Sequence, residues 1–205
     1  MVRSRASLEL ALAESIHRAR NDLHAISVLL RLQALASDGD VRQALERAAS
    51  RVDAMASLNA RLDRWSEGGA QVDSRGFLAG MVADINDIYM DDRPIRLTIH
   101  ADVRALPADT ARVLGLIINE LVANALKYAF PGDRSGTVAI DFEHDDDTCV
   151  LSVRDDGVGF DADAAPRGSG IGSKVVRALA QQIDAEFTFA RADPAGTVCT
   201  IAWRC

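Results

Sequence analysis

Three short segments in the second half of the chain carry residues that could bind a nucleotide. They run from Asn119 to Ala125, from Asp155 to Gly159 and from Gly168 to Gly172. Any one of them is weak evidence, because polar helix faces, Asp-Gly turns and glycine-rich hinges are common in proteins. In this order they place polar groups on a helix, a carboxylate at a strand end and a glycine-rich loop before another helix. This combination predicts a nucleotide site.

Glu120, Asn124 and Lys127 are spaced so that they share one face of a predicted helix over 108–129, whose other face is apolar. An acid, an amide oxygen and an ammonium within about two turns can interact with an attacking group, a metal ion and a phosphate oxygen, respectively. Taken alone, this spacing would favour an ordinary surface pattern of Glu and Lys. Together with the two other segments, the spacing favours a nucleotide site.

Asp155 ends a predicted strand over 148–155, and alternation along this strand places its carboxylate on the inward side with Leu151 and Val153. A buried carboxylate is costly unless it finds a hydrogen-bond donor, which the exocyclic amine of a purine could supply. The alternative interpretation is an ordinary Asp-Gly turn. The second glycine, Gly159, weakens that alternative because it allows the backbone to approach a flat ligand closely.

The glycines of 168–172 lead into a predicted helix over 171–183. Exposed amides in the first turn of a helix favour a bound phosphate, so this loop could cradle a triphosphate. A plain hinge is the alternative, since the pattern is neither a P-loop nor a dinucleotide fingerprint. The eight residues between Gly159 and Gly168 suit a short mobile lid.

His17 lies among cations in the first predicted helix, next to Arg18 and near Arg20. It borders the apolar stripe of that helix, where its ring can be exposed while its backbone is held rigid. With an ordinary pKa of about 6.5, the imidazole is largely neutral at physiological pH and offers a lone pair to phosphorus. His17 is therefore the predicted phosphoryl acceptor, and His24, seven residues on, is the second candidate.

Two long helices must hold this histidine. Residues 7–36 lack Gly and Pro and carry apolar residues at helical spacing, a turn follows at 37–40, and 41–62 repeat apolar residues in a four-three pattern. Helices of this length joined by a short turn form an antiparallel hairpin, and their apolar stripes are too wide to cover each other. The pattern predicts a homodimer with a four-helix bundle.

A second domain follows a glycine-containing linker at 67–71. The first domain is therefore predicted at 1–66 and the second at 72–205. Its predicted helices and strands alternate as in an α/β sandwich, which makes the fold class α+β. They are a helix at 75–90, a strand at 95–101, a helix at 108–129, strands at 137–143 and 148–155, a helix at 171–183, and strands at 186–191 and 197–203.

Composition excludes some classes of partner. A net charge of −7 and a pI near 5.1 argue against a nucleic-acid binder, since phosphate binding needs clustered cations. No apolar run approaches the roughly 20 residues of a membrane span, so we expect no membrane segment in this chain. Cys149, Cys199 and Cys205 show no metal-binding spacing, which indicates reduced thiols and a cytoplasmic protein.

Taken together, these segments resemble the bacterial two-component sensor histidine kinases, in particular the branch with a His-Arg-x-Lys-Asn pattern in its acceptor helix. Here that pattern runs from His17 to Asn21, with Arg20 in place of the usual lysine. The resemblance covers nearly the whole chain. It implies a dimerisation and histidine-phosphotransfer hairpin, followed by an ATP-binding domain of the GHKL (Bergerat) type.

The resemblance also implies residue roles. Asn124 would be the Mg²⁺ ligand, Glu120 the acid that assists His17, and Asp155 the carboxylate that binds adenine. Lys127 and Tyr128 would line the phosphate and adenine sides of the ATP site. The hinges of the ATP lid would be Gly157, Gly159, Gly168, Gly170 and Gly172.

One subgroup of these kinases does not fit the sequence. Asn119 stands where the HWE subgroup has a histidine, and the stretch from Leu151 to Val153 lacks its Trp-x-Glu motif. We therefore place the chain outside that subgroup.

The activity implied is autophosphorylation of a histidine with Mg-ATP, followed by transfer of the phosphoryl group to an aspartate of a response-regulator receiver domain. Two alternatives stay open on the sequence. One is a phosphorelay histidine phosphotransferase whose second domain does not use ATP. The other is a GHKL regulator that phosphorylates a protein serine or binds a partner without using His17.

Overall fold

A computed structural model describes residues 21–65, 71–89, 94–159 and 171–204, and all structural statements below concern these residues. The chain divides into two compact units between Arg64 and Trp65. The first contains a helical segment at 21–35 and all but the last residue of helix α2 (Gly39–Trp65). The part of the first predicted helix before residue 21, which includes His17, lies outside the described residues.

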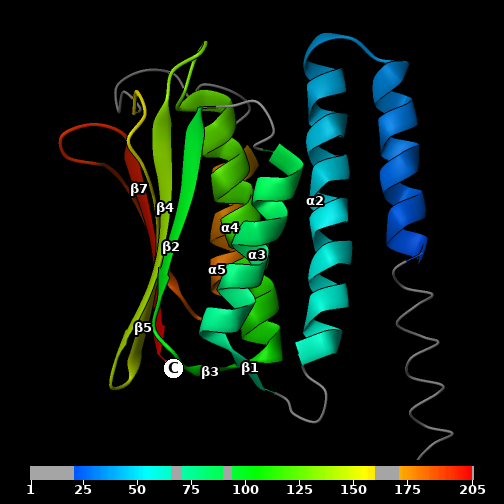
Figure 1. Ribbon diagram of the computed structural model, residues 1–205. Helices are drawn as coiled ribbons and strands as arrows, with labels where there is room; N and C mark the ends of the chain where they lie inside the picture. Colours follow the sequence, from blue (N-terminus) through cyan, green and yellow to red (C-terminus); the bar gives the residue numbers. More distant parts are fainter. Residues whose placement is uncertain (1–20, 66–70, 90–93, 160–170, 205) are drawn as a thin grey trace, which may run out of the picture. The chain divides into compact units, whose positions relative to one another are not determined.

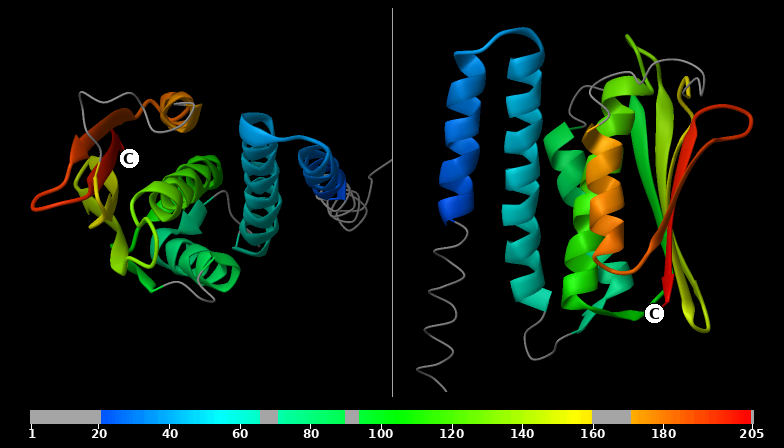
Figure 2. Two further views of the ribbon diagram at one scale, coloured as in Figure 1. Left: turned by 90° about the horizontal axis from the view of Figure 1, so that it is seen from above. Right: turned by 180° about the vertical axis from the view of Figure 1, so that it is seen from behind.

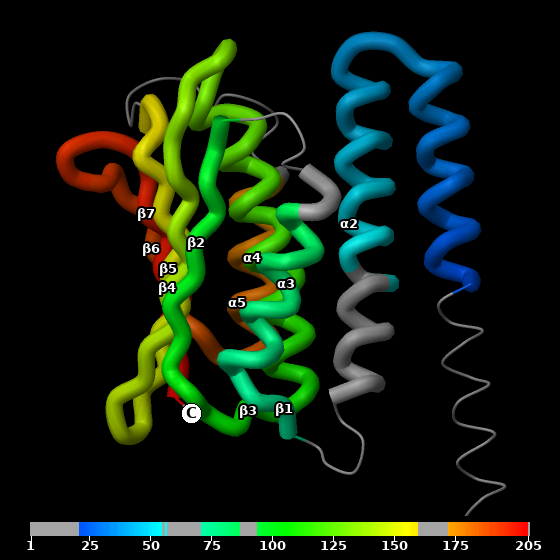
Figure 3. Tube along the Cα trace, in the orientation of Figure 1, coloured from blue at the N-terminus to red at the C-terminus, as the bar shows by residue number. Residues whose placement is uncertain are grey.

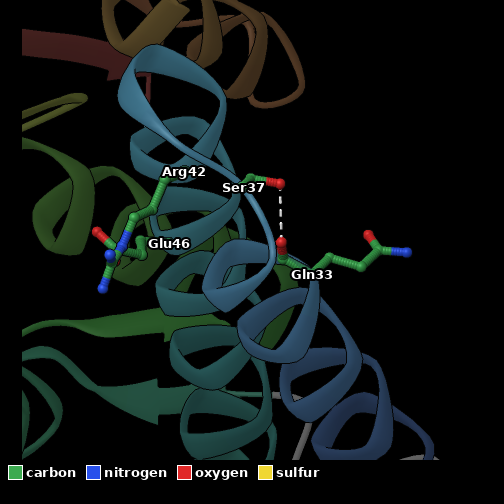
Figure 4. A network of polar contacts seen from close by, with 4 residues as sticks. All are labelled: Gln33, Ser37, Arg42 and Glu46. Atoms are coloured by element: carbon green, nitrogen blue, oxygen red, sulfur yellow. Dashed lines mark hydrogen bonds and ion pairs between the residues drawn. The ribbon is translucent and has the colours of Figure 1, made fainter.

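A short turn joins the two helices of the first unit. The hydroxyl of Ser37 donates a hydrogen bond of 2.8 Å to the carbonyl of Gln33, which satisfies one of the last carbonyls of the helix (Figure 4). Arg42 and Glu46 form an i, i+4 ion pair of 3.1 Å at the start of α2 (Figure 4). Arg31 and Asp53 pair at 2.7 Å from one helix to the other. The predicted antiparallel hairpin is confirmed for the described residues.

This hairpin leaves apolar side chains uncovered. Ser27, Ala34 and Ala49 are buried, while Leu35 is 71% exposed. Together the exposed apolar side chains are Ile26, Val28, Leu29, Leu32, Leu35 and Val41. Apolar surface of this extent on one hairpin marks an interaction face. None of the described helices combines the length and apolar character needed to cross a membrane.

The second unit packs three helices on one face of a sheet (Figures 1 and 2). In the described residues this sheet has five strands in the order β2-β4-β5-β7-β6, with β2 parallel to β4 and every other pair antiparallel. The helices are α3 (Ser74–Tyr89), α4 (Ala108–Tyr128) and α5 (Ile171–Gln181). The strands are β2 (Ile95–Ala101), β4 (Gly136–Asp145), β5 (Thr148–Asp155), β6 (Glu186–Arg191) and β7 (Thr197–Arg204).

Alternating apolar residues on the strands form the core against α4. On β4 the buried residues are Val138, Ile140 and Phe142, and on β5 the same alternation ends at Asp155. The facing side of α4 buries residues such as Leu114, Ile117 and Ile118 completely. Each large aliphatic side chain buried in this way stabilises the fold by about 1.5–3 kcal/mol. The core therefore fixes the rotation of α4 and the side to which Asp155 points.

A small two-stranded sheet was not expected from the sequence. Strands β1 (Gln71–Asp73) and β3 (Ala105–Pro107) form a two-stranded sheet, so Gln71 begins a strand although it was assigned to the linker. Runs of three residues are too short for alternation to reveal them. The Asp73 carboxylate then accepts the amide of Gly76 at 2.7 Å and caps α3.

The expectation of three reduced cysteines is wrong for Cys149. Its sulfur is in a disulfide bond. Cys199 is free and buried. Sequence spacing gave no sign of the bond, because pairing depends on how closely the β carbons approach in the folded chain.

Candidate functional site

Four elements meet at one end of the second unit. There α4 ends, β4 begins, β5 ends and α5 begins (Figures 1 and 3). Contacts between their residues hold them together: Gly172 lies against Glu120, and the amide of Val158 donates to the carbonyl of Ala129 at 2.9 Å. The described residues of the three sequence segments that predicted a nucleotide site converge at this end.

Glu120 and Asn124 lie one turn apart on α4. Glu120 is buried, with 7% of its surface exposed, and Asn124 is half-buried. The side-chain nitrogen of Asn124 lies 3.5 Å from Oε1 of Glu120, which makes a long hydrogen bond. Because the opposite face of α4 is locked in the core, these two side chains have little freedom to turn away.

The first turn of α5 lies directly against this pair. A Cβ atom on Gly172 would stand 2.7 Å from Oε1 of Glu120 and 2.9 Å from the side-chain nitrogen of Asn124. Any larger residue would have to displace one of the two side chains. The absence of a side chain at Gly172 thus brings the positive end of α5 next to an acid and an amide.

Asp155 is almost fully buried at the end of β5 and points inward, as alternation predicted. Its Oδ1 accepts the amide of Gly157 at 3.0 Å. The pKa of its carboxyl is raised above the ordinary 3.8, chiefly because the group is buried. Hydrogen bonds from the amide of Gly157 and from the amide and hydroxyl of Thr197 lower this pKa, and the negative charge of Asp156 raises it further.

Gly157 brings the end of β5 against the end of α4. A Cβ atom on Gly157 would overlap the backbone of Ala129, the residue that caps α4. Gly159 has a φ of +67°, and a Cβ atom there would lie 2.9 Å from the carbonyl oxygen of Gly196. Both positions require glycine, the first for close approach and the second for its backbone conformation as well.

Lys127 and Tyr128 end α4 at the same end of the unit. The Lys127 ammonium lies 5.3 Å from the centre of the Tyr128 ring, a cation–π contact. Lys127 is exposed and Tyr128 is half-buried. A cation thus lies one turn beyond Asn124 on the same helix.

The described structure brings together most of the predicted site residues: Glu120, Asn124, Lys127, Tyr128, Asp155, Gly157, Gly159 and Gly172. His17, Gly168 and Gly170 lie outside the described residues. Sequence reasoning missed Thr197, which the pairing of β5 with β7 places opposite Asp155. A threonine opening a late strand carries no local signal of this role.

The donor set fits a magnesium ion carried by a nucleotide. Mg²⁺ prefers oxygen ligands and commonly binds through one or two protein groups, with phosphates and water completing its shell. The Asn124 amide and the Glu120 carboxylate offer such oxygens within one turn of α4. Among the described residues no cluster of three or more His, Cys, Asp or Glu side chains could hold a metal ion without that help.

Two family models match the chain. Residues 109–204 match the family described as histidine kinase-, DNA gyrase B- and HSP90-like ATPase. Residues 14–89 match a family described as histidine kinase. The first match contains every described residue of the candidate site, and the second includes position 17.

Curated relatives agree with these matches. The sensor histidine kinase PdtaS of Mycobacterium tuberculosis is 32% identical over 180 residues, which cover 86% of this chain and 36% of that protein. Blue-light-activated histidine kinase 2 of Erythrobacter litoralis is 31% identical over 202 residues, covering 95% of this chain and 57% of that protein. The chain thus spans between about a third and three fifths of these relatives.

A solved structure extends the likeness to the fold. The Erythrobacter litoralis EL346 blue-light activated histidine kinase superimposes with a TM-score of 0.69 at 29% identity, over 98% of this chain and 60% of that one. The chain belongs to the bacterial two-component histidine kinases with an ATP-binding domain of the GHKL type.

Proposed function

We propose that this chain is an ATP-dependent protein histidine kinase. It phosphorylates His17 with Mg-ATP and then passes the phosphoryl group to an aspartate of a response-regulator receiver domain. The observation that carries the proposal is the inward carboxylate of Asp155, close to Gly157, which packs against the end of α4. Glu120 and Asn124 of the same helix adjoin the first turn of α5. The proposed adenine and phosphate sites thus both adjoin α4.

Asp155 binds the adenine. Its ionised carboxylate accepts a hydrogen bond from the exocyclic amine, while Gly157 and Thr197 hold it in place. This explains why a carboxylate is kept at a buried position where it costs stability.

The triphosphate lies between α4 and α5. First-turn amides of α5 and the ammonium of Lys127 attract its oxygens, and the amide oxygen of Asn124 would hold the metal. Magnesium, when bound, neutralises the charge that develops on the phosphates during transfer. We also assign Gly157, Gly159, Gly168, Gly170 and Gly172 as the hinges that let the lid close over the nucleotide.

His17 is the nucleophile. Its neutral ring nitrogen forms a bond to the γ-phosphorus, the bond from that phosphorus to the bridging oxygen breaks, and ADP leaves. Glu120 orients the ring or accepts its proton. Nearly all of the rate enhancement in such a transfer comes from positioning and charge neutralisation.

We further propose that the chain acts as a homodimer in the cytoplasm, where ATP and receiver domains occur. The exposed apolar stripe of the hairpin supports a four-helix bundle between two copies. In this arrangement 1–66 form the dimerisation and phosphotransfer hairpin, 67–71 the linker and 72–205 the ATP-binding domain.

The test is incubation of the purified chain with γ-labelled ATP and Mg²⁺. We expect an acid-labile label that disappears in His17→Ala and persists in the matched control His24→Ala. Asn124→Ala should also abolish labelling. Absence of label together with uptake from a phosphorylated receiver would replace the kinase with a relay protein.

A further inference from the structure

Asp156 follows Asp155 and ends the ladder between β5 and β4 in an unusual way. Its amide donates to the carbonyl of Thr137 at 3.2 Å, as the next rung of an antiparallel ladder requires. The return bond should run from the amide of Thr137 to the carbonyl of Asp156. That amide instead donates to Oδ1 of the Asp156 side chain, at 2.8 Å.

The displaced carbonyl of Asp156 has another partner. Nη2 of Arg134 donates to it at 3.2 Å. The backbone can therefore leave the sheet at Asp156 without leaving the amide of Thr137 unsatisfied, which would be costly. A side-chain oxygen takes over the place of a main-chain oxygen at the last rung.

From this geometry we propose that Asp156 is a positioning residue for nucleotide binding. By fastening the end of β5 to the start of β4, it sets where the carboxylate of Asp155 meets the base. The inference rests on the proposed binding of adenine by Asp155.

The connection between Asp156 and the start of β4, here called the joint, is closely packed. A Cβ atom on Gly136 would lie 2.5 Å from Oδ1 of Asp156 and would overlap the ring of Phe130. On the other side, Gly157 is pressed against Ala129 at the end of α4. The segment that carries Asp155 is thus held by both β4 and α4. A shift of the backbone at Asp156 would therefore also move Asp155.

The charge of Asp156 works against this role, which shapes the experiment. Its carboxylate lies near that of Asp155 and raises the pKa of Asp155. Asp156→Ala and Asp156→Asn remove this charge equally, but only asparagine keeps an oxygen that can accept the amide of Thr137. Comparing these two variants isolates the hydrogen bond from the charge.

The experiment measures binding of Mg-ATP and of Mg-purine riboside triphosphate, which lacks the exocyclic amine, to the full chain by calorimetry. We expect Asp156→Asn to bind ATP within about twofold of the wild type and Asp156→Ala about tenfold more weakly, a change of about 1.4 kcal/mol. Binding of the amine-free nucleotide should be the same in all three proteins. Asp141→Ala is the control, since it removes one charge from β4, the strand to which Asp156 is bonded.

Equal ATP affinity in Asp156→Ala and Asp156→Asn would overturn the inference, and so would an equal loss for both nucleotides in Asp156→Ala. If Asp156→Ala does not fold, Arg134→Ala serves instead, with an expected loss of about threefold for ATP only. Hydrogen exchange of the Thr137 amide reports on the joint without nucleotide and should quicken in Asp156→Ala alone. A wild type that binds neither nucleotide refutes the proposed function, whereas unchanged exchange at Thr137 refutes the joint itself.

Discussion

Replacing Gly172 by alanine separates the geometry of the site from the stability of the fold. The new Cβ would lie 2.7 Å from Oε1 of Glu120, whereas ordinary contacts begin near 3.4 Å, so about 0.7 Å of movement is needed. In an α-helix alanine is favoured over glycine by about 1 kcal/mol, and overpacking costs about 1–3 kcal/mol. The two effects largely cancel, and we expect the free energy of unfolding to fall by no more than about 2 kcal/mol.

The reaction should be far more sensitive than the fold. A displacement of about 1 Å at reacting groups can cost about a hundredfold in rate, so we expect autophosphorylation to slow at least tenfold in Gly172→Ala. The assay is the initial rate of label incorporation at saturating Mg-ATP, with thermal unfolding measured on the same samples. Gly76→Ala is the matched control, because it makes the same change in the first turn of α3 and meets only the Asp73 carboxylate, at 3.0 Å.

A Gly172→Ala protein with an unchanged rate and unchanged ATP affinity would refute the reasoning. It would mean that the first turn of α5 does not lie against Glu120 and Asn124 when the phosphoryl group is transferred. Loss of activity in both glycine variants would instead point to a general effect on folding.

The remaining predictions concern charge, reactivity and assembly. Because the pKa of Asp155 is raised in the folded state, its ionisation lowers the stability of the fold as pH rises from about 3.8 through the folded pKa. Asp155→Asn should therefore unfold at a higher temperature than the wild type at pH 7 while losing ATP binding. A lower unfolding temperature would contradict this. Burial, with a smaller contribution from Asp155, raises the pKa of Cys199 to about 12, so iodoacetamide at pH 8 should modify Cys199 only after denaturation, as peptide mass spectrometry can verify. Leu32→Asp places a charge on the exposed stripe and should convert the homodimer to a monomer in light scattering, whereas the exposed Arg31→Ala should leave the dimer intact. A monomeric wild type would remove the basis for the dimer.

Local patterns were sufficient for most of the helices and strands. The helical spacing of α4 and the alternation of β5 were read correctly, including the inward direction of Asp155. Patterns of this kind succeed because one buried face repeats at the period of the element. They failed for β1 and β3, which have three residues each, and for the disulfide at Cys149.

What the sequence by itself determined was the set of elements and the residue types presented at their ends: an acid and an amide on α4, a carboxylate after β5 and a glycine in the first turn of α5. Tertiary structure alone decided the contacts between them. The pairing of β5 with β7 brings Thr197 to Asp155, and the packing of α5 brings Gly172 within reach of Glu120. The hydrogen bond from the amide of Thr137 to the side chain of Asp156, in place of the main-chain carbonyl, is also a tertiary contact. Such contacts join residues far apart in the chain, and their geometry depends on how whole elements pack rather than on any local period.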